Sequence, residues 1–143
     1  PAAVQAEVPA AKVLKNGEKT TVLGIGIEAV PMYNNVRGPE AGKLFHDKGR
    51  GNGYVLTFAD KRVYLSGDTE CTDEMKALQN IDVAFVCMNL PYTMPPAEAA
   101  QCAKAFKPKI LYPYHFRDSD LTELTKGLEG EKSIEVRLRN WYP

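Results

Sequence analysis

The stretch Arg62-Val63-Tyr64-Leu65-Ser66-Gly67-Asp68-Thr69 is the most informative segment of this chain. Its first half predicts a β-strand, because Val, Tyr and Leu fit a pleated, half-buried surface. The strand ends before Gly67, and Asp68 then places a carboxylate at the C-terminal end of the strand, where a glycine leaves room for a ligand. The local sequence alone favours a simpler role for Asp68, in which it caps the turn that follows.

The chain before this segment carries hairpin signals, which predict antiparallel strands. One tight turn is expected at Asp60-Lys61 and another at Asn16-Gly17. Residues 2–11 form a loose lead-in, and residues 33–53 form a long polar loop of the kind that is usually functional or disordered. The expected strands in this part of the chain are residues 12–14, 19–23, 25–32, 54–59 and 62–66.

The chain after this segment alternates between helix and strand signals. Thr72 is placed to cap a short helix, and residues 81–88 are apolar enough for a strand that is covered on both faces. Hairpins followed by alternating elements predict an α/β or α+β fold with a layered sheet. The later elements are expected to be a helix at 95–106, a strand at 109–114, a helix bearing Leu121, Leu124 and Leu128 with its cap at Asp118, Ser119 or Asp120, and a strand at 133–139.

The composition argues against several classes of protein. The 143 residues include 18 Lys plus Arg and 18 Asp plus Glu, so the formal net charge is zero and gives no basis for nucleic acid or an anionic membrane as a partner. No apolar run reaches the roughly 20 residues that a membrane span needs. The three cysteines have no repeated spacing, which predicts no disulfide framework and favours a reducing, cytoplasmic setting. Cys87 and Cys102 are expected to be small buried apolar residues.

Two histidines join Asp68 as candidate functional residues. His115 ends the expected strand at 109–114, and His46 lies in the long polar loop. The neutral imidazole is the commonest metal ligand among side chains. A lone histidine at a strand end is more often structural than catalytic, and only the combination of the histidines with Asp68 favours a metal site.

That combination resembles the metallo-β-lactamase superfamily, and especially its broad group of bacterial and archaeal metal-dependent hydrolases. The resemblance runs from roughly residue 14 to residue 116 and implies a fold of four αββα layers. Residues 1–143 would then be a single partial domain, the C-terminal αβ half, with a mixed sheet and helices on one face. The motifs that carry the resemblance are Glu28-Ala29-Val30-Pro31-Met32-Tyr33-Asn34, the His46 loop with Gly51-Asn52-Gly53-Tyr54, Ser66-Gly67-Asp68-Thr69, Ile81-Asp82-Val83-Ala84, Tyr92-Thr93-Met94 and Pro113-Tyr114-His115.

The resemblance also implies roles for individual residues. Asp68 matches the carboxylate that bridges two metal ions, His115 matches the last histidine ligand of the second metal, and His46 is a candidate to complete the first metal site. Asp68 and His115 are accordingly the expected catalytic residues. Zn²⁺ is the default metal for mixed histidine and carboxylate ligands, with Mn²⁺ and Fe²⁺ as alternatives. The side chains expected to rim the cleft, as substrate contacts or as ordinary packing residues, are those of Tyr33, Asn34, Tyr92 and Thr93.

One hallmark of the superfamily, the motif His-x-His-x-Asp-His, is absent from this sequence. We therefore expect the partner to be the missing N-terminal half of the fold or a second copy of the chain. In an intact relative, water activated at a dizinc site would attack an ester, amide, lactone or phosphodiester of a small-molecule substrate, and the isolated chain should be inactive. Two alternatives are a non-catalytic half-domain that acts through oligomerisation or protein binding, and a module that binds a ligand near Asp68 without turnover.

Overall fold

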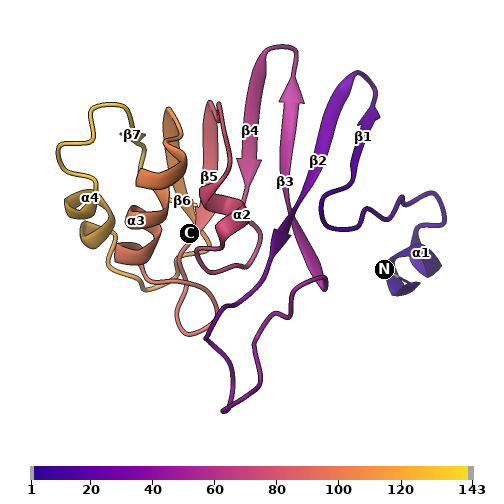
Figure 1. Ribbon diagram of the computed structural model, residues 1–143, viewed down its shortest axis with the longest axis horizontal. Coiled ribbons are helices and arrows are strands. Elements are labelled where there is room, and N and C mark those ends of the chain that lie inside the picture. The colour runs from indigo at the N-terminus through magenta and orange to yellow at the C-terminus, as the bar shows by residue number, and fades with distance from the viewer. Residues whose placement is uncertain (1, 142–143) are drawn as a thin grey trace.

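The computed structural model describes residues 2–141, and within them the strands form one seven-stranded mixed sheet (Figure 1). The order of the strands across the sheet is their order along the chain. The strands are β1 (Lys19–Val22), β2 (Ile25–Met32), β3 (Gly51–Phe58), β4 (Lys61–Leu65), β5 (Val83–Cys87), β6 (Ile110–Tyr114) and β7 (Glu135–Val136). The helices are α1 (Ala2–Glu7), α2 (Asp73–Lys76), α3 (Pro96–Phe106) and α4 (Thr122–Gly127).

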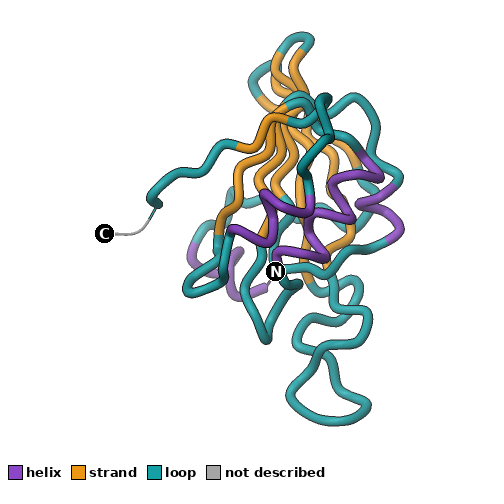
Figure 2. The backbone as a smooth tube through the Cα atoms, turned by 90° about the vertical axis from the view of Figure 1, so that its left-hand side faces the viewer, coloured by secondary structure: helices purple, strands orange, loops and turns teal. Residues whose placement is uncertain are grey.

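The sheet changes character at β4. Strands β1 to β4 pair antiparallel, with tight turns between β1 and β2 and between β3 and β4 and the long loop of residues 33–50 between β2 and β3. Strands β4 to β7 pair parallel through crossovers that contain α2, α3 and α4. Parallel crossovers are right-handed almost without exception, so strands that advance in one direction place all their helices on the same face. Figure 2 shows the helices of the parallel part on one side of the strands. The expected mixed sheet with helices on one face is confirmed.

Two neighbouring rows of side chains show how differently the two faces are packed. The covered row, on the helix side, crosses the sheet through Val55, Tyr64, Ala84 and Leu111, which are at most 1% exposed. The open row lies on the other face of the sheet. Each of its members is the chain neighbour of a residue in the covered row, and all of them are half-buried. The open row consists of Tyr54, Leu65, Phe85 and Tyr112.

The buried side of helix α3 is made mostly of small residues. Pro96 is tolerated in the first turn, where its missing N–H costs no helical hydrogen bond, and Lys107 ends the helix in the left-handed conformation before Pro108. Phe106 closes this side with an edge-on ring contact to Tyr64 at 5.9 Å between centroids. The small buried residues of α3 are Ala99, Ala100, Cys102 and Ala103.

The expected roles of the cysteines need a correction. Cys71 and Cys102 form a disulfide that links the segment after β4 to α3 across 31 residues of sequence. The crossover brings the two thiols together, which their spacing in the sequence could not reveal. Cys87 is free and buried, as expected.

Several predicted elements also differ in the structure. Residues 12–14 form no strand, and the first hairpin turns instead at Leu23 and Gly24, which both have positive φ, as a two-residue hairpin turn of this kind requires. Part of the expected loose lead-in is the short helix α1. The expected strand at 133–139 shrinks to β7, because the alternating apolar residues of this segment run out of core to face, as the 46% exposure of Leu138 shows. No described helix has the length and apolar content that a membrane span requires.

Candidate metal centre

The carboxyl ends of three adjacent parallel strands bring the candidate residues together. Asp68 follows β4, Asn89 follows β5 and His115 follows β6 directly. Ligands in open α/β sheets gather at this edge because parallel strands all end there. Nδ1 of His115 lies 2.8 Å from Oδ1 of Asp68, and its Nε2 lies 3.3 Å from Nδ2 of Asn89. The predicted convergence of Asp68 and His115 is confirmed.

His46 reaches the same place from the long loop. Its Nε2 lies 3.9 Å from Oδ2 of Asp68, on the side of the carboxylate opposite His115. Asn34 holds the loop there, because its Oδ1 accepts from the backbone N of His46 at 2.9 Å and lies 2.7 Å from the ring Nδ1. The side chains of the three candidate ligands are partly exposed, between 21% and 39%, so the site is open to solvent and to a ligand.

The backbone around the site is in unusual conformations. Gly67 has φ of +65°, and a Cβ at that position would lie 2.7 Å from Sδ of Met32, so no other residue fits without a shift. His115 itself has φ of +46°, a conformation that side chains other than glycine seldom adopt and that clusters at functional sites. Both deviations aim the residues at the strand ends toward one point.

The aromatic residues at the rim are fixed by neighbours. The Tyr33 hydroxyl donates to Glu74 at 2.9 Å, and the Lys48 ammonium lies 4.8 Å above the Tyr33 ring. Burial and the Glu74 carboxylate raise the pKa of Tyr33, so its hydroxyl stays protonated at neutral pH. Tyr92 is 41% exposed and packs edge-on against Phe45. Contact of these two rings with a substrate stays a prediction.

The other two residues expected at the rim are buried instead. Asn34 is 1% exposed, and its amide is fully engaged with His46, Glu70 and the carbonyl oxygen of Tyr92. Thr93 is 0% exposed, and its hydroxyl accepts from the Asn89 backbone N and donates to the Asn89 carbonyl. Both side chains hold loops of the site in place, and neither has a polar atom left for a substrate in this conformation.

Two groups behind the site are kept neutral. Burial raises the pKa of the Cys87 thiol, whose sulfur lies 3.5 Å from the backbone N of Thr69. Burial also raises the pKa of Tyr114 to about 12. These two neighbours therefore add no charge beside the Asp68 carboxylate, whose negative charge favours a cation.

The donor atoms suit a divalent metal but are incomplete. Two imidazoles and one carboxylate match the ligand chemistry of zinc, manganese and iron. Within residues 2–141, however, no group of three or more His, Cys, Asp or Glu side chains is arranged so that it could hold a metal ion. Asp68 lies within 4 Å of both His46 and His115, and the three side chains would form part of a ligand set.

Sequence reasoning missed two residues of this site. Asn89 follows an apolar strand, the same signal that marks Asp68 and His115, and could have been found that way. Glu70 is an acidic residue that the structure buries to 1% exposure, and no periodicity in the sequence indicates that. Its partners come from a loop more than thirty residues earlier in the chain.

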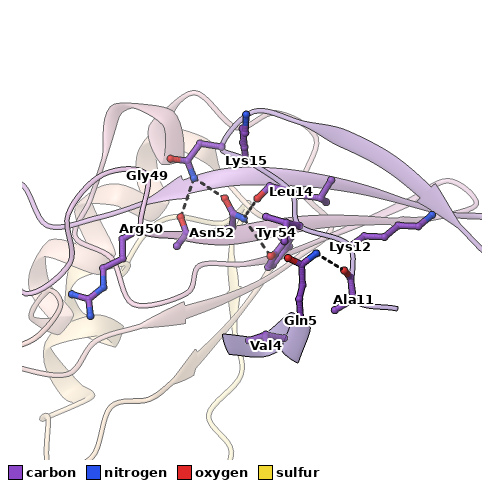
Figure 3. A pocket seen from close by; sticks show the side chains of 13 residues that line it. Val4, Gln5, Ala11, Lys12, Leu14, Lys15, Gly49, Arg50, Asn52 and Tyr54 are labelled. Atoms are coloured by element: carbon purple, nitrogen blue, oxygen red, sulfur yellow. Dashed lines mark hydrogen bonds between the residues drawn. The ribbon is translucent and has the colours of Figure 1, made fainter. Parts of the chain in front are cut away.

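A separate cavity of about 650 Å³ lies between the N-terminal segment and β3 (Figure 3). Its polar contacts are internal, since Asn16 donates to Asn52 at 2.6 Å and Asn52 donates to the Leu14 carbonyl at 2.8 Å. The charged ends of its basic side chains point away from one another in Figure 3, so no charge converges there. These basic residues are Lys12, Lys15 and Arg50.

Comparison with solved structures places this arrangement among known hydrolase folds. A metal-dependent hydrolase from Parabacteroides distasonis is 46% identical and superimposes with a TM-score of 0.87 over 97% of this chain and 62% of that one. The metallo hydrolase Igni18 from Ignicoccus hospitalis is 21% identical, with a TM-score of 0.75 over 97% of this chain and 62% of that one, and shows the same fold.

Sequence comparison agrees. A metal-dependent hydrolase from Solibacter usitatus is 36% identical over 104 residues, which cover 64% of this chain and 45% of the relative, so the chain spans less than half the length of that relative. Residues 2–115 match the family model described as a beta-lactamase superfamily domain. With the strand-end site and the mixed sheet, this match shows that the chain belongs to the metallo-β-lactamase superfamily.

Proposed function

We propose that this chain forms part of a metal-dependent hydrolase. The observation that carries the proposal is the convergence of Asp68, His46 and His115 at the carboxyl edge of the sheet. The relatives from Parabacteroides and Solibacter, both named metal-dependent hydrolases, support the reaction class. The substrate class is an ester, amide, lactone or phosphodiester, each of which has an electrophilic carbon or phosphorus that water can attack.

The proposed roles follow from the donor atoms. Asp68 would share its carboxylate between cations, while His115 and His46 would each contribute one ring nitrogen. A bound divalent cation polarises the scissile group and lowers the pKa of a coordinated water to about 7. The exposed ring of Tyr92 and the fixed ring of Tyr33 would border the substrate. Zinc suits the mixed donor set best, with manganese and iron as alternatives.

The proposal includes a partner, because three side chains are too few for a closed dinuclear site. The open row presents a half-buried apolar surface, and the chain's own Trp141 packs against Phe85 and Tyr112 at one end of it. We propose that a second sheet, from another segment or another chain, covers this surface and supplies the motif His-x-His-x-Asp-His. Apolar contact between sheet faces is the usual way in which such surfaces are buried.

The test compares the chain alone with the chain plus a polypeptide that carries the missing motif. The chain alone should bind Zn²⁺ weakly and hydrolyse little of a panel of ester, lactone and phosphodiester substrates, whereas the combination should do both. In the active combination, Asp68→Ala should reduce turnover by at least 100-fold while the fold remains intact, since a metal ligand and its charge are lost. Asp73→Ala is the matched control, since that carboxylate is 94% exposed and outside the site. Efficient metal-dependent hydrolysis by the chain alone would contradict the proposed need for a partner.

The open row also favours a second function. Neighbouring half-buried apolar side chains on one face favour an interaction site, so we propose as the second candidate that the chain binds another protein or a second copy without catalysis. Sedimentation analysis separates the two functions. A stable homodimer that binds no metal and hydrolyses nothing, even with the missing motif supplied, would favour the non-catalytic role.

A further inference from the structure

Beside the candidate metal centre lies a buried carboxylate to which the proposed mechanism gives no task. Glu70 is 1% exposed and follows Asp68 by two residues. Burial by itself would raise the pKa of Glu70, but hydrogen bonds from Asn34 and from three backbone amides outweigh it and hold the pKa below its usual range. The carboxylate oxygens accept from Asn34 Nδ2 at 3.1 Å and from the backbone N of Asn35, Val36 and Arg37 at 3.0, 3.2 and 2.8 Å.

These bonds determine which way the Asn34 amide faces. Its Nδ2 lies between the Glu70 carboxylate and the Tyr92 carbonyl oxygen at 2.9 Å, and neither partner can donate a hydrogen bond. Its Oδ1 faces the backbone N of His46, which can only donate. If the amide were turned over, Oδ1 would face the Glu70 carboxylate and the Tyr92 carbonyl oxygen, which are acceptors, and Nδ2 would face the His46 backbone N–H, which is a donor. The hydrogen-bond partners on both sides therefore fix the orientation of the amide.

The Asn34 oxygen in turn determines the state of the His46 ring. A ring nitrogen 2.7 Å from an oxygen that can only accept must carry a proton, so Nδ1 of His46 is the protonated nitrogen. In the neutral ring, Nε2 then presents a lone pair toward Asp68 Oδ2, 3.9 Å away. Two acceptors that face each other without a proton between them form a favourable place for a cation.

We propose that Glu70 is a positioning residue of the candidate metal centre: through Asn34 it holds His46 as the Nδ1–H tautomer, with the Nε2 lone pair directed at Asp68. This inference rests on the proposed function only in treating Nε2 as a metal-facing atom. Hydrogen bonds to the second ring nitrogen commonly fix the tautomer and orientation of metal-binding histidines, and their loss costs about 10- to 100-fold in metal affinity.

The test is a long-range ¹H–¹⁵N correlation spectrum of the metal-free 143-residue chain, at a pH where both histidines are neutral. With only two histidines in the sequence, the His115→Gln variant assigns the His46 signals. The wild-type chain should show His46 as a single Nδ1–H tautomer. Glu70→Gln should convert it to a mixture of tautomers, because a glutamine amide cannot accept from Asn34 and from three backbone amides together. Zn²⁺ affinity should fall about 10- to 100-fold in the same variant.

The control is Glu74→Gln, another carboxylate near the site, which bonds to Tyr33 and Lys48 and has no contact with Asn34. It should leave the His46 tautomer unchanged. If Glu70→Gln does not fold, Asn34→Ala removes the middle link and should give the same mixture. A wild-type His46 in the Nε2–H form, or a tautomer unchanged in both variants, would overturn the proposal. Failure of the proposed function would instead appear as absent hydrolysis with the tautomer held as described.

Discussion

The covered row and the open row are made by the same four strands, yet they have different partners. Val55, Tyr64, Ala84 and Leu111 of the covered row lie under helices and exclude water almost completely. The open row is at least as bulky and is joined by a stacked pair, Phe85 and Tyr112, at 5.2 Å between ring centroids. The apolar character of a row therefore does not determine its burial. The covered row stabilises the chain, whereas the open row leaves apolar surface partly exposed, and this is the surface that we propose a partner covers.

The same difference bears on the metal centre. Asp68 and His115 project from strand ends whose covered side is already packed, so their backbone positions are fixed by the core. His46 lies on a loop that is held mainly by polar contacts through Asn34. One part of the candidate site is thus supported by packing and the other by hydrogen bonds.

The sharpest test of the comparison applies one substitution to both rows. Leu111→Ala should lower the free energy of unfolding by about 2–5 kcal/mol, because it leaves a cavity under the helices. Leu65→Ala, in the open row, should cost only about 1–2 kcal/mol, since that side chain is half-buried. Urea unfolding of both variants measures the difference. Equal losses would mean that the open row is as well packed as the covered one.

Removal of the disulfide tests how much the stability of the covered face of the sheet depends on a covalent link. Replacing Cys71 and Cys102 together by Ser should lower the free energy of unfolding by about 2–4 kcal/mol, because the cross-link restricts a 31-residue segment in the unfolded chain. The melting temperature should fall by about 5–15 °C. Dithiothreitol should produce a similar drop in the wild-type chain and none in the double variant. If reduction left the melting temperature of the wild-type chain unchanged, the disulfide would not contribute to the stability of the fold.

Substitution in the open row should change the binding of apolar probes more than it changes the stability of the fold. Tyr112→Thr places a β-branched residue in the strand and removes the ring that stacks on Phe85 and packs edge-on against Trp141, which should cost about 1 kcal/mol. Binding of a hydrophobic dye such as ANS should fall with it, because exposed apolar surface is lost. If dye binding is unchanged, the apolar surface lies elsewhere than on the open row.

The smallest effect is expected at Asp82, which directly precedes β5 and belongs to neither row. The Lys109 ammonium and the backbone N of Arg62 donate to Asp82 at 2.7 and 2.9 Å and hold its pKa below the usual range. A carboxyl whose pKa is lower in the folded state stabilises the fold above its unfolded pKa, and the stabilisation disappears as pH falls through the folded pKa. Asp82→Asn should therefore cost about 1 kcal/mol or less at pH 7, and the difference from wild type should vanish near pH 2. A difference that grows on acidification would contradict this sign.

The ends of the strands could be predicted from the sequence, because the spacing of apolar residues and the position of glycines are signals that neighbouring residues carry. These signals predict the strand ends that carry Asp68 and His115, whereas the interpretation of the two residues as metal ligands rests on the family resemblance. The parallel arrangement that brings them together follows from the alternating helices and strands. The predicted strand at 133–139 failed for the opposite reason. Ile134, Val136 and Leu138 alternate like a strand, but Leu138 is 46% exposed and has no core to face.

Long-range polar contacts could not be predicted. The bond between Glu70 and Asn34 spans 36 residues, and the disulfide spans 31, with no pattern in the sequence that pairs either set. The turn expected at Asn16-Gly17 is formed, with Glu18 N donating to the Lys15 carbonyl at 3.0 Å and Gly17 at positive φ. The strand expected before it, residues 12–14, is not formed, so the turn joins no hairpin of the sheet.

The sequential strand order has a consequence for aggregation. It leaves β1 and β7 at the two edges of the sheet, and these strands have only four and two residues. Short edge strands with charged side chains, such as Lys19 and Glu135 here, offer little backbone for another chain to extend the sheet. The edge strands therefore disfavour the addition of further strands and growth into a cross-β fibril. The open row, in contrast, does not prevent contact between the faces of two sheets.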